Sequence, residues 1–200
     1  IDPVRFIGNY SSGKMGFALA EACAERGAEV TLVAGPVSLK THHPAIKRID
    51  VESAGEMYQA AMTAFPSSDA AILCAAVADY RPENASEQKI KRETEREMTL
   101  HLVPNPDIAA SLGAIKREGQ VMVGFALETN DEATHAEGKL KRKNLDFIVL
   151  NSLRDQGAGF RCDTNKITII DNAGGVTSYP LKTKREVACD IVNKLVTLLK

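Results

Sequence analysis

The sequence contains no tryptophan, and aromatic residues make up only 5% of its 200 residues. A surface that binds single-stranded nucleic acid by stacking bases on aromatic rings is therefore not indicated. An excess of one charge is also lacking, because 25 Lys and Arg residues stand against 26 Asp and Glu residues, for a net charge of -1 at pH 7. Without an overall field that would hold a polyanion such as duplex DNA, any binding of phosphate groups must be local.

Patterns typical of disulfides and metal sites are missing as well. The 4 cysteines lie far apart with no Cys-x-x-Cys pair, so we interpret them as reduced thiols. No uninterrupted apolar run could cross a bilayer, and residues 1–5 have neither the basic region nor the apolar stretch of a signal peptide. With 44% hydrophobic and 26% charged residues, we expect one soluble domain over residues 1–200 and a cytoplasmic location.

The apolar residues alternate between the period of strands and that of helices. This pattern predicts an α/β fold of the Rossmann-like, doubly wound type with a mostly parallel sheet. Residues 166–171 and 176–179 indicate a C-terminal antiparallel hairpin, whereas the charge-dense stretch 81–97 is expected to be a mobile flap. The other expected strands are 28–34, 46–51, 70–77, 99–103, 121–126 and 147–150, and the expected helices are 17–26, 53–65, 107–116, 132–143 and 184–199.

Residues 8–15, Gly-Asn-Tyr-Ser-Ser-Gly-Lys-Met, nearly match the phosphate loop G-x-x-x-x-G-K-S/T. Met15 stands where a hydroxyl group should hold Mg²⁺, and a thioether cannot ligate a hard cation. What remains is a helix that begins around Ser11, Ser12 and Gly13, whose free N–H groups and dipole attract an anion. A helix N-cap without a ligand is the commoner outcome of such a sequence.

Two motifs follow predicted strands, where ligands bind in doubly wound folds. Residues 75–80, Ala-Ala-Val-Ala-Asp-Tyr, combine small side chains that let a ring or a phosphate approach with Asp79, which could hold a metal ion or a ribose. A strand end that turns into solvent explains them equally well. Residues 105–108, Asn-Pro-Asp-Ile, start a helix, and capping by Asp107 would be enough to explain them.

Other candidates are weaker when each is taken alone. Lys89 lies in the polar stretch, where most lysines are solvated, although a lysine on a flap can contact a triphosphate. Lys139 and Lys143 lie one helical turn apart on one side of a predicted helix, which suits two donors to one polar ligand or simply a solvated face. Phe125 ends a predicted strand, and such a residue is more often part of the core than a ligand contact.

Together and in this order, the motifs resemble the bacterial phosphopantothenoylcysteine synthetase family. The resemblance covers nearly the whole chain, and its set of motifs is highly specific. It implies a CTP-dependent ligase of coenzyme A biosynthesis that joins 4′-phosphopantothenate to L-cysteine through an acyl-cytidylate and releases CMP and pyrophosphate, with Mg²⁺ present. The segments that carry it are 1–7, Asn9 with 11–16, 75–80, 89–91, 105–108, 124–126 and 139–146.

The same resemblance implies roles for individual residues. Lys89 is expected to offset negative charge on the leaving pyrophosphate, and Asn9 is expected to hold the acyl carbonyl or its oxyanion while the cysteine amine attacks. Asp79 is the expected contact for the metal ion. The expected nucleotide-binding residues are Ser11, Ser12, Gly13, Ala75, Ala76, Asp79, Lys89, Asn105, Pro106, Asp107, Ile108, Phe125, Lys139 and Lys143.

The resemblance also bears on partners and on chain organisation. It implies a homodimer with the flap near the partner subunit, and a fused flavin-dependent decarboxylase domain that would carry FMN outside this domain. Family members have a strand and a Gly-rich turn before the segment that matches residues 1–5, so a first, central strand and part of the phosphate seat are expected to be missing here. Pro104 stands where the family commonly has a basic residue.

Two other function classes share this pattern. A dinucleotide-binding oxidoreductase is disfavoured because no G-x-G-x-x-G opens the first helix and Gly35-Pro36 stands where an acid should follow the strand. A module that senses nucleotides without turnover would bind CTP tightly and release no pyrophosphate. The residues alone do not decide between CTP and ATP.

Overall fold

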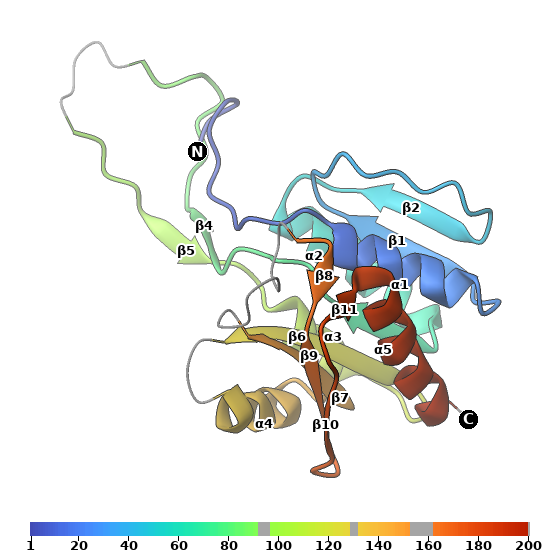
Figure 1. Cartoon of the computed structure of the whole chain (residues 1–200). Coiled ribbons are helices and arrows are strands. Elements are labelled where there is room, and N and C mark those ends of the chain that lie inside the picture. Colours follow the sequence, from blue (N-terminus) through green and yellow to red (C-terminus); the bar gives the residue numbers. More distant parts are fainter. Residues whose placement is uncertain (92–96, 129–131, 153–161, 200) are drawn as a thin grey trace.

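The computed structural model describes residues 1–91, 97–128, 132–152 and 162–199. Figure 1 shows a layered body of sheet and helices from which a long arm projects. We define the arm as residues 80–91 and 97–104, whose base is closed by the antiparallel strands β4 (Tyr80–Pro82) and β5 (Leu102–Pro104). The α/β class predicted from the sequence is confirmed.

A five-stranded sheet in the order β10-β9-β7-β6-β3 forms the centre of the body. Strands β3 (Ala70–Leu73), β6 (Val121–Glu128) and β7 (Phe147–Ser152) are parallel neighbours. Strands β9 (Ile167–Asp171) and β10 (Val176–Ser178) add antiparallel to β7. The predicted C-terminal hairpin is therefore confirmed, as is the parallel core.

Strands β1 (Val30–Ala34) and β2 (Ile46–Asp50) pair in parallel as a separate two-stranded sheet. The apolar pattern identified both strands, but it could not show that β1 and β3 fall in different sheets, because pairing depends on contacts between segments distant in the chain. The expected additional strand before residue 1 stays a prediction.

Five α-helices pack around the sheets in the described residues. Side chains cap the starts of α2, α3 and α5: Ser53 caps α2, Asp107 caps α3 as the sequence predicts, and Thr183 with Glu186 forms a capping box at α5. The helices are α1 (Lys14–Ala24), α2 (Ala54–Ala64), α3 (Ile108–Ile115), α4 (Glu132–Arg142) and α5 (Lys184–Leu198), and the remaining short elements are η1 (Phe65–Ser67), β8 (Thr164–Asn165) and β11 (Lys182–Thr183).

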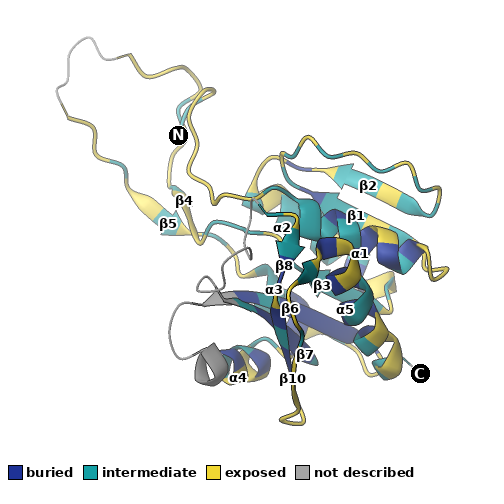
Figure 2. Cartoon of the chain, in the orientation of Figure 1, coloured by how far each residue is buried: buried dark blue, intermediate teal, exposed yellow. Residues whose placement is uncertain are grey.

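Two apolar cores cover the two faces of the five-stranded sheet, as a doubly wound fold requires. Figure 2 shows buried residues along the central strands β6 and β7. Along β7, Phe147 and Val149 face one core, whereas Ile148 and Leu150 face the other. This alternation follows from the period of two in a strand. Helices α1 and α5 supply the first core, and α3 and α4 supply the second.

The cysteines of this fold are free thiols of intermediate exposure. Burial raises the pKa of the Cys74 thiol to about 12, so this group stays protonated at neutral pH. Among the residues that the structure describes, no helix is long and apolar enough to span a membrane.

The Asp171 carboxylate stabilises the β9–β10 turn, and replacing it should change the stability of the protein in a pH-dependent way. The carboxylate accepts hydrogen bonds from Lys194 Nζ at 2.9 Å and from the N–H of Gly175 at 2.8 Å, which lower its pKa. The stabilisation is present above the pKa of the unfolded chain, about 3.9, and is lost as pH falls through the lower folded pKa. Asp171→Asn should reduce the free energy of unfolding by about 1–2 kcal/mol at pH 7.

Urea unfolding at pH 7 and pH 3 measures this effect. Asp190→Asn is the matched control, because Asp190 pairs with Lys182 at equal side-chain exposure. It should reduce the free energy of unfolding by less than Asp171→Asn does. A loss for Asp171→Asn that is the same at both pH values would contradict the explanation.

Candidate active site

A cavity of about 90 Å³ lies between the sheet and helices α3 and α4. Gly124 on β6 forms part of its wall, and a Cβ atom there would lie 2.5 Å from Leu145 Cδ1. The absence of a side chain at this position therefore allows Leu145 to pack against the sheet. The residues that line the cavity are Leu73, Ala109, Gly124, Phe125, Lys139, Lys143, Leu145 and Ile148.

The two lysines predicted as a pair lie on the same cavity. Lys139 and Lys143 are linked by the hydrogen bond from the Lys143 N–H to the Lys139 carbonyl, 3.0 Å, at the end of α4. Both line the cavity together with Phe125. Three residues that two weak sequence signals had suggested separately thus share one concave surface.

Asp107 connects this surface to α3. One carboxylate oxygen accepts the N–H of Ala110 at 3.0 Å as the N-cap of α3, and the other lies 3.0 Å from Lys143 Nζ. Partial burial alone would raise the pKa of Asp107, but the N–H of Ala110 and the Lys143 ammonium hold it below its usual range. The carboxylate therefore stays ionised at neutral pH and orients Lys143.

The segment 74–79 leaves the sheet earlier than predicted, since β3 ends at Leu73 and not at residue 77. Two asparagine amides hold it. Asn9 Nδ2 donates to the Val77 carbonyl at 3.1 Å, and Asn105 Nδ2 donates to the Ala78 carbonyl at 2.8 Å. These bonds replace the sheet pairing that ends at β3 and fix the backbone that leads to Asp79.

Asn105 also has an unused acceptor. Its backbone N–H donates to the Asp79 carbonyl at 2.8 Å, whereas its side-chain oxygen Oδ1 is buried and has no hydrogen-bond partner among the residues that the structure describes. Buried polar atoms are nearly always paired in folded proteins. The Oδ1 atom is therefore suited to accept a hydrogen bond from a ligand.

Asp79 is the residue predicted to contact a metal ion. It is exposed, as is Ala75, and Ala76 is half-buried. In the described ranges, no three His, Cys, Asp or Glu side chains gather in a group that could hold a metal ion. Magnesium is commonly held by one or two carboxylates together with phosphate oxygens of a substrate, and the metal role of Asp79 stays a prediction.

The start of α1 lies beside this segment, since a Cβ atom on Gly16 would lie 3.4 Å from Cys74 Sγ. Helix α1 begins at Lys14 after Gly13, which has a φ of 73°, a conformation that favours glycine. Ser11 Oγ accepts the Gly13 N–H at 3.3 Å. The predicted helix start is confirmed, and Lys14 is paired with Asp163 at 2.5 Å.

Lys89 lies away from these residues. It is exposed on the arm, which projects from the body in Figure 1, and it is not among the residues that line the cavity. Pro106 is exposed before the cap of α3, and Ile108 packs against the second core. The structure therefore brings together most of the predicted site but not Lys89.

Sequence reasoning missed the apolar wall of the cavity, which consists of Leu73, Ala109, Leu145 and Ile148. Each looks like an ordinary core residue in the sequence. The register of β6 against β3 and β7 aligns Leu73 and Ile148 with Gly124, whereas Ala109 comes from α3 and Leu145 from the turn after α4. It also missed the pairing of Asp107 with Lys143, for which the spacing of 36 positions gives no local signal.

The arrangement of these motifs has counterparts in known proteins. The chain matches the DNA/pantothenate metabolism flavoprotein C-terminal domain family over residues 1–199. The chain belongs to this family. The resemblance inferred from the sequence is thereby confirmed.

Individual family members are similar over the full chain. The identity is 59% over 199 residues to a cysteine/cysteine sulfinic acid decarboxylase of an unknown prokaryotic organism. It is 48% over 200 residues to the coenzyme A biosynthesis bifunctional protein CoaBC of Vibrio parahaemolyticus, and 44% over 199 residues to that of Escherichia coli. These matches cover 98–100% of the chain but 55%, 50% and 48% of the relatives, so the chain spans about half the length of the curated relatives it matches.

Solved structures agree with this family. The crystal structure of the C-terminal domain of CoaBC matches with a TM-score of 0.83 and 38% identity, covering 100% of this chain and 89% of that one. The DNA/pantothenate metabolism flavoprotein of Streptococcus pneumoniae matches with a TM-score of 0.81 at 20% identity, covering 98% of this chain and 93% of that one. The second match shows a shared fold alone.

Proposed function

We propose that the chain is the ligase domain of coenzyme A biosynthesis that joins 4′-phosphopantothenate to L-cysteine with CTP. One observation carries the proposal: Phe125, Lys139 and Lys143, which come from two separate motifs of the resemblance, line one cavity. The match to the C-terminal domain of CoaBC at 38% identity supports it.

The reaction needs two steps because a carboxylate is a poor electrophile. In the first step, a carboxylate oxygen of phosphopantothenate bonds to the α-phosphorus of CTP, and pyrophosphate leaves with the electron pair of the broken bond. In the second step, the cysteine nitrogen bonds to the acyl carbon, CMP leaves and the amine loses a proton. The mixed anhydride that forms in the first step supplies the leaving group that the free acid lacks.

The residues of the site have separate roles in this reaction. Lys139 and Lys143 bind polar groups of the nucleotide, and Asp107 keeps Lys143 oriented. Asn105 Oδ1 accepts a hydrogen bond from an amino or hydroxyl group of the nucleotide. The metal ion, when bound beside Asp79, neutralises charge on the triphosphate.

Asn9 and the start of α1 face the other substrate in this proposal. One N–H of the Asn9 amide holds the Val77 carbonyl, which leaves its second N–H to hold the acyl carbonyl. Ser11, Ser12 and Gly13 present N–H groups that suit a phosphate. Both assignments follow the resemblance, and the contacts around residues 74–79 support them.

Exposed apolar side chains on the arm and on the segment before α1 support a homodimer. Val4, Phe6 and Tyr10 from the segment before α1 are 63%, 82% and 78% exposed, and Tyr80 and Met98 of the arm are 55% and 49% exposed. Apolar surface of this kind marks an interaction site. A second copy that packs on the arm would cover it and would bring Lys89 near another chain. A fused flavin-dependent decarboxylase domain and a cytoplasmic location complete the proposal.

The decisive experiment mixes the protein with CTP, Mg²⁺ and phosphopantothenate and measures pyrophosphate before cysteine is added. Release without cysteine is expected, whereas release that strictly requires cysteine would contradict the stepwise scheme. Thermal-shift measurements with CTP, ATP and NADPH then distinguish a ligase from an oxidoreductase and from a nucleotide sensor. Stabilisation by NADPH alone would favour an oxidoreductase, and CTP binding without pyrophosphate release would favour a nucleotide sensor.

A further inference from the structure

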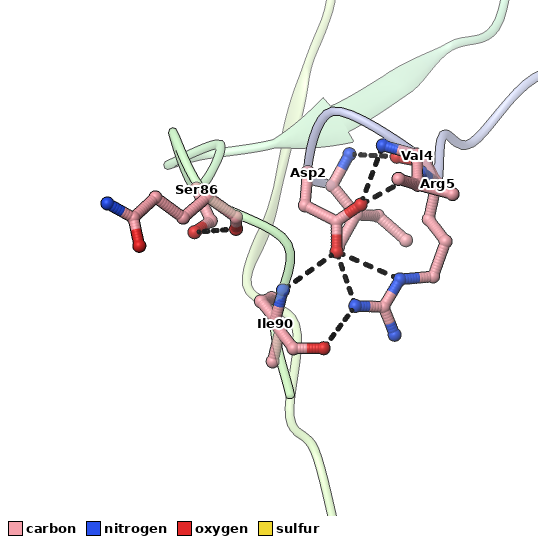
Figure 3. A network of polar contacts seen from close by, with 7 residues as sticks. Asp2, Val4, Arg5, Ser86 and Ile90 are labelled. Carbon is pink, nitrogen blue, oxygen red and sulfur yellow. Dashed lines mark hydrogen bonds and ion pairs between the residues drawn. The ribbon is translucent and has the colours of Figure 1, made fainter. Parts of the chain in front are cut away.

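Residues 1–5 contact the arm at the residue that follows Lys89 (Figure 3). The Ile90 N–H donates to Asp2 Oδ2 at 3.2 Å, and the Ile90 carbonyl accepts from Arg5 Nη2 at 2.9 Å. The Ser86 N–H donates to the Ile1 carbonyl at 2.9 Å. Both backbone polar groups of Ile90 are therefore held by segments more than 80 positions away in the chain.

Asp2 is the centre of this contact. Its Oδ1 accepts the N–H groups of Val4 and Arg5, both at 2.9 Å. Its Oδ2 accepts from Arg5 Nε at 2.9 Å and from Arg5 Nη2, in addition to Ile90. The Asp2 side chain is 0% exposed although it lies in an exposed segment. Two guanidinium N–H groups thus converge on one carboxylate oxygen, and charge-assisted hydrogen bonds of this kind are stronger than neutral ones.

The rest of the described arm is held by weaker contacts. Strands β4 and β5 pair over three residues each at its base. Beyond them, Glu83 and His101 form an ion pair at 3.0 Å with both side chains more than half exposed, and such exposed pairs contribute little. The contact of Asp2 and Arg5 thus holds the residue next to Lys89 by two hydrogen bonds from a distant segment, one to each backbone polar group of Ile90.

We infer that Asp2 and Arg5 are positioning residues that fix the backbone next to Lys89 for the departure of pyrophosphate. This inference rests on the proposed function of Lys89. The Ile90 N–H belongs to the peptide group that joins Lys89 to Ile90, so the bond to Asp2 fixes the plane directly after the Lys89 Cα atom. A fixed backbone leaves only the lysine side chain to be ordered when the triphosphate binds, which lowers the entropic cost of the step.

Two variants test this role without touching the core. Asp2→Asn keeps the shape but removes the charge, and Arg5→Lys keeps the charge but removes the planar fork. Each should speed hydrogen exchange at the Ile90 amide and should slow pyrophosphate release roughly ten- to hundredfold with little change in the KM for CTP. Glu83→Gln, on the same arm but outside the contact, should change neither measurement.

A double variant distinguishes positioning from general damage. If Asp2 acts through Lys89, Asp2→Asn should cause no further loss of rate in the Lys89→Ala background. An equal loss in both backgrounds would overturn the inference, and so would unchanged exchange at Ile90. A wild-type chain that releases no pyrophosphate would overturn the proposed function and the catalytic part of this inference, while hydrogen exchange would still decide whether Asp2 holds the arm.

Discussion

Lys89→Ala is expected to slow pyrophosphate release about 10²–10³-fold, as loss of one group that stabilises transition-state charge typically does. Negative charge builds on the leaving pyrophosphate, and an ammonium group brought to it lowers the barrier. CTP binding should weaken much less, because the lysines on the cavity remain. Rapid-quench measurement of pyrophosphate at saturating CTP gives the rate of this step.

Lys91→Ala is the matched control, since Lys91 carries the same charge on the same arm on the other side of Ile90 and is also exposed. A similar loss in both variants would mean that general positive charge of the arm, and not Lys89, assists the step. Lys89 lies away from the cavity of its own chain. Mixing Lys89→Ala with Lys143→Ala subunits therefore tests whether Lys89 acts at the cavity of its own chain or at that of a partner subunit. Activity regained on mixing would show that the arm serves a partner's cavity.

Gly113→Ala is expected to lower the free energy of unfolding by about 3 kcal/mol, at the upper end for an added methyl group in a packed interior. A Cβ atom at Gly113 would lie 2.2 Å from the Lys143 carbonyl oxygen and 2.8 Å from its carbonyl carbon. These are backbone atoms, held in place because Asn144 Nδ2 donates to the Gly113 carbonyl at 3.0 Å. Relief of the clash must therefore separate α3 from the turn after α4.

Chemical denaturation measures the loss, and Gly55→Ala provides the control. Gly55 lies in α2 with its nearest neighbour, Ser53 Oγ, 3.9 Å from an added Cβ atom, so alanine there should stabilise the helix by up to about 1 kcal/mol. Because Lys143 lines the cavity, Gly113→Ala should also weaken CTP binding. Equal stability of the two variants would contradict the close packing described.

The sequence was sufficient to predict the helices, the C-terminal hairpin and the order of the motifs. Strand and helix periods are local properties, so β6 and β7 were located to within two residues at every end. Capping by Asp107 was also readable, because a cap depends on neighbours within one turn. The family resemblance could be recognised from the sequence as well, because the order of the motifs is a property of the sequence itself.

Other features were decided only by the tertiary structure. The division of the parallel strands into two sheets, the unpaired Oδ1 of Asn105 and the pairing of Asp2 with Ile90 each involve residues far apart in the chain. Such contacts depend on how elements pack, since a hydrogen bond needs its partner within about 3 Å. The sequence by itself therefore determined which residues form elements and motifs, while packing decided which of them meet, because for residues of different elements the separation along the chain does not fix the distance in space.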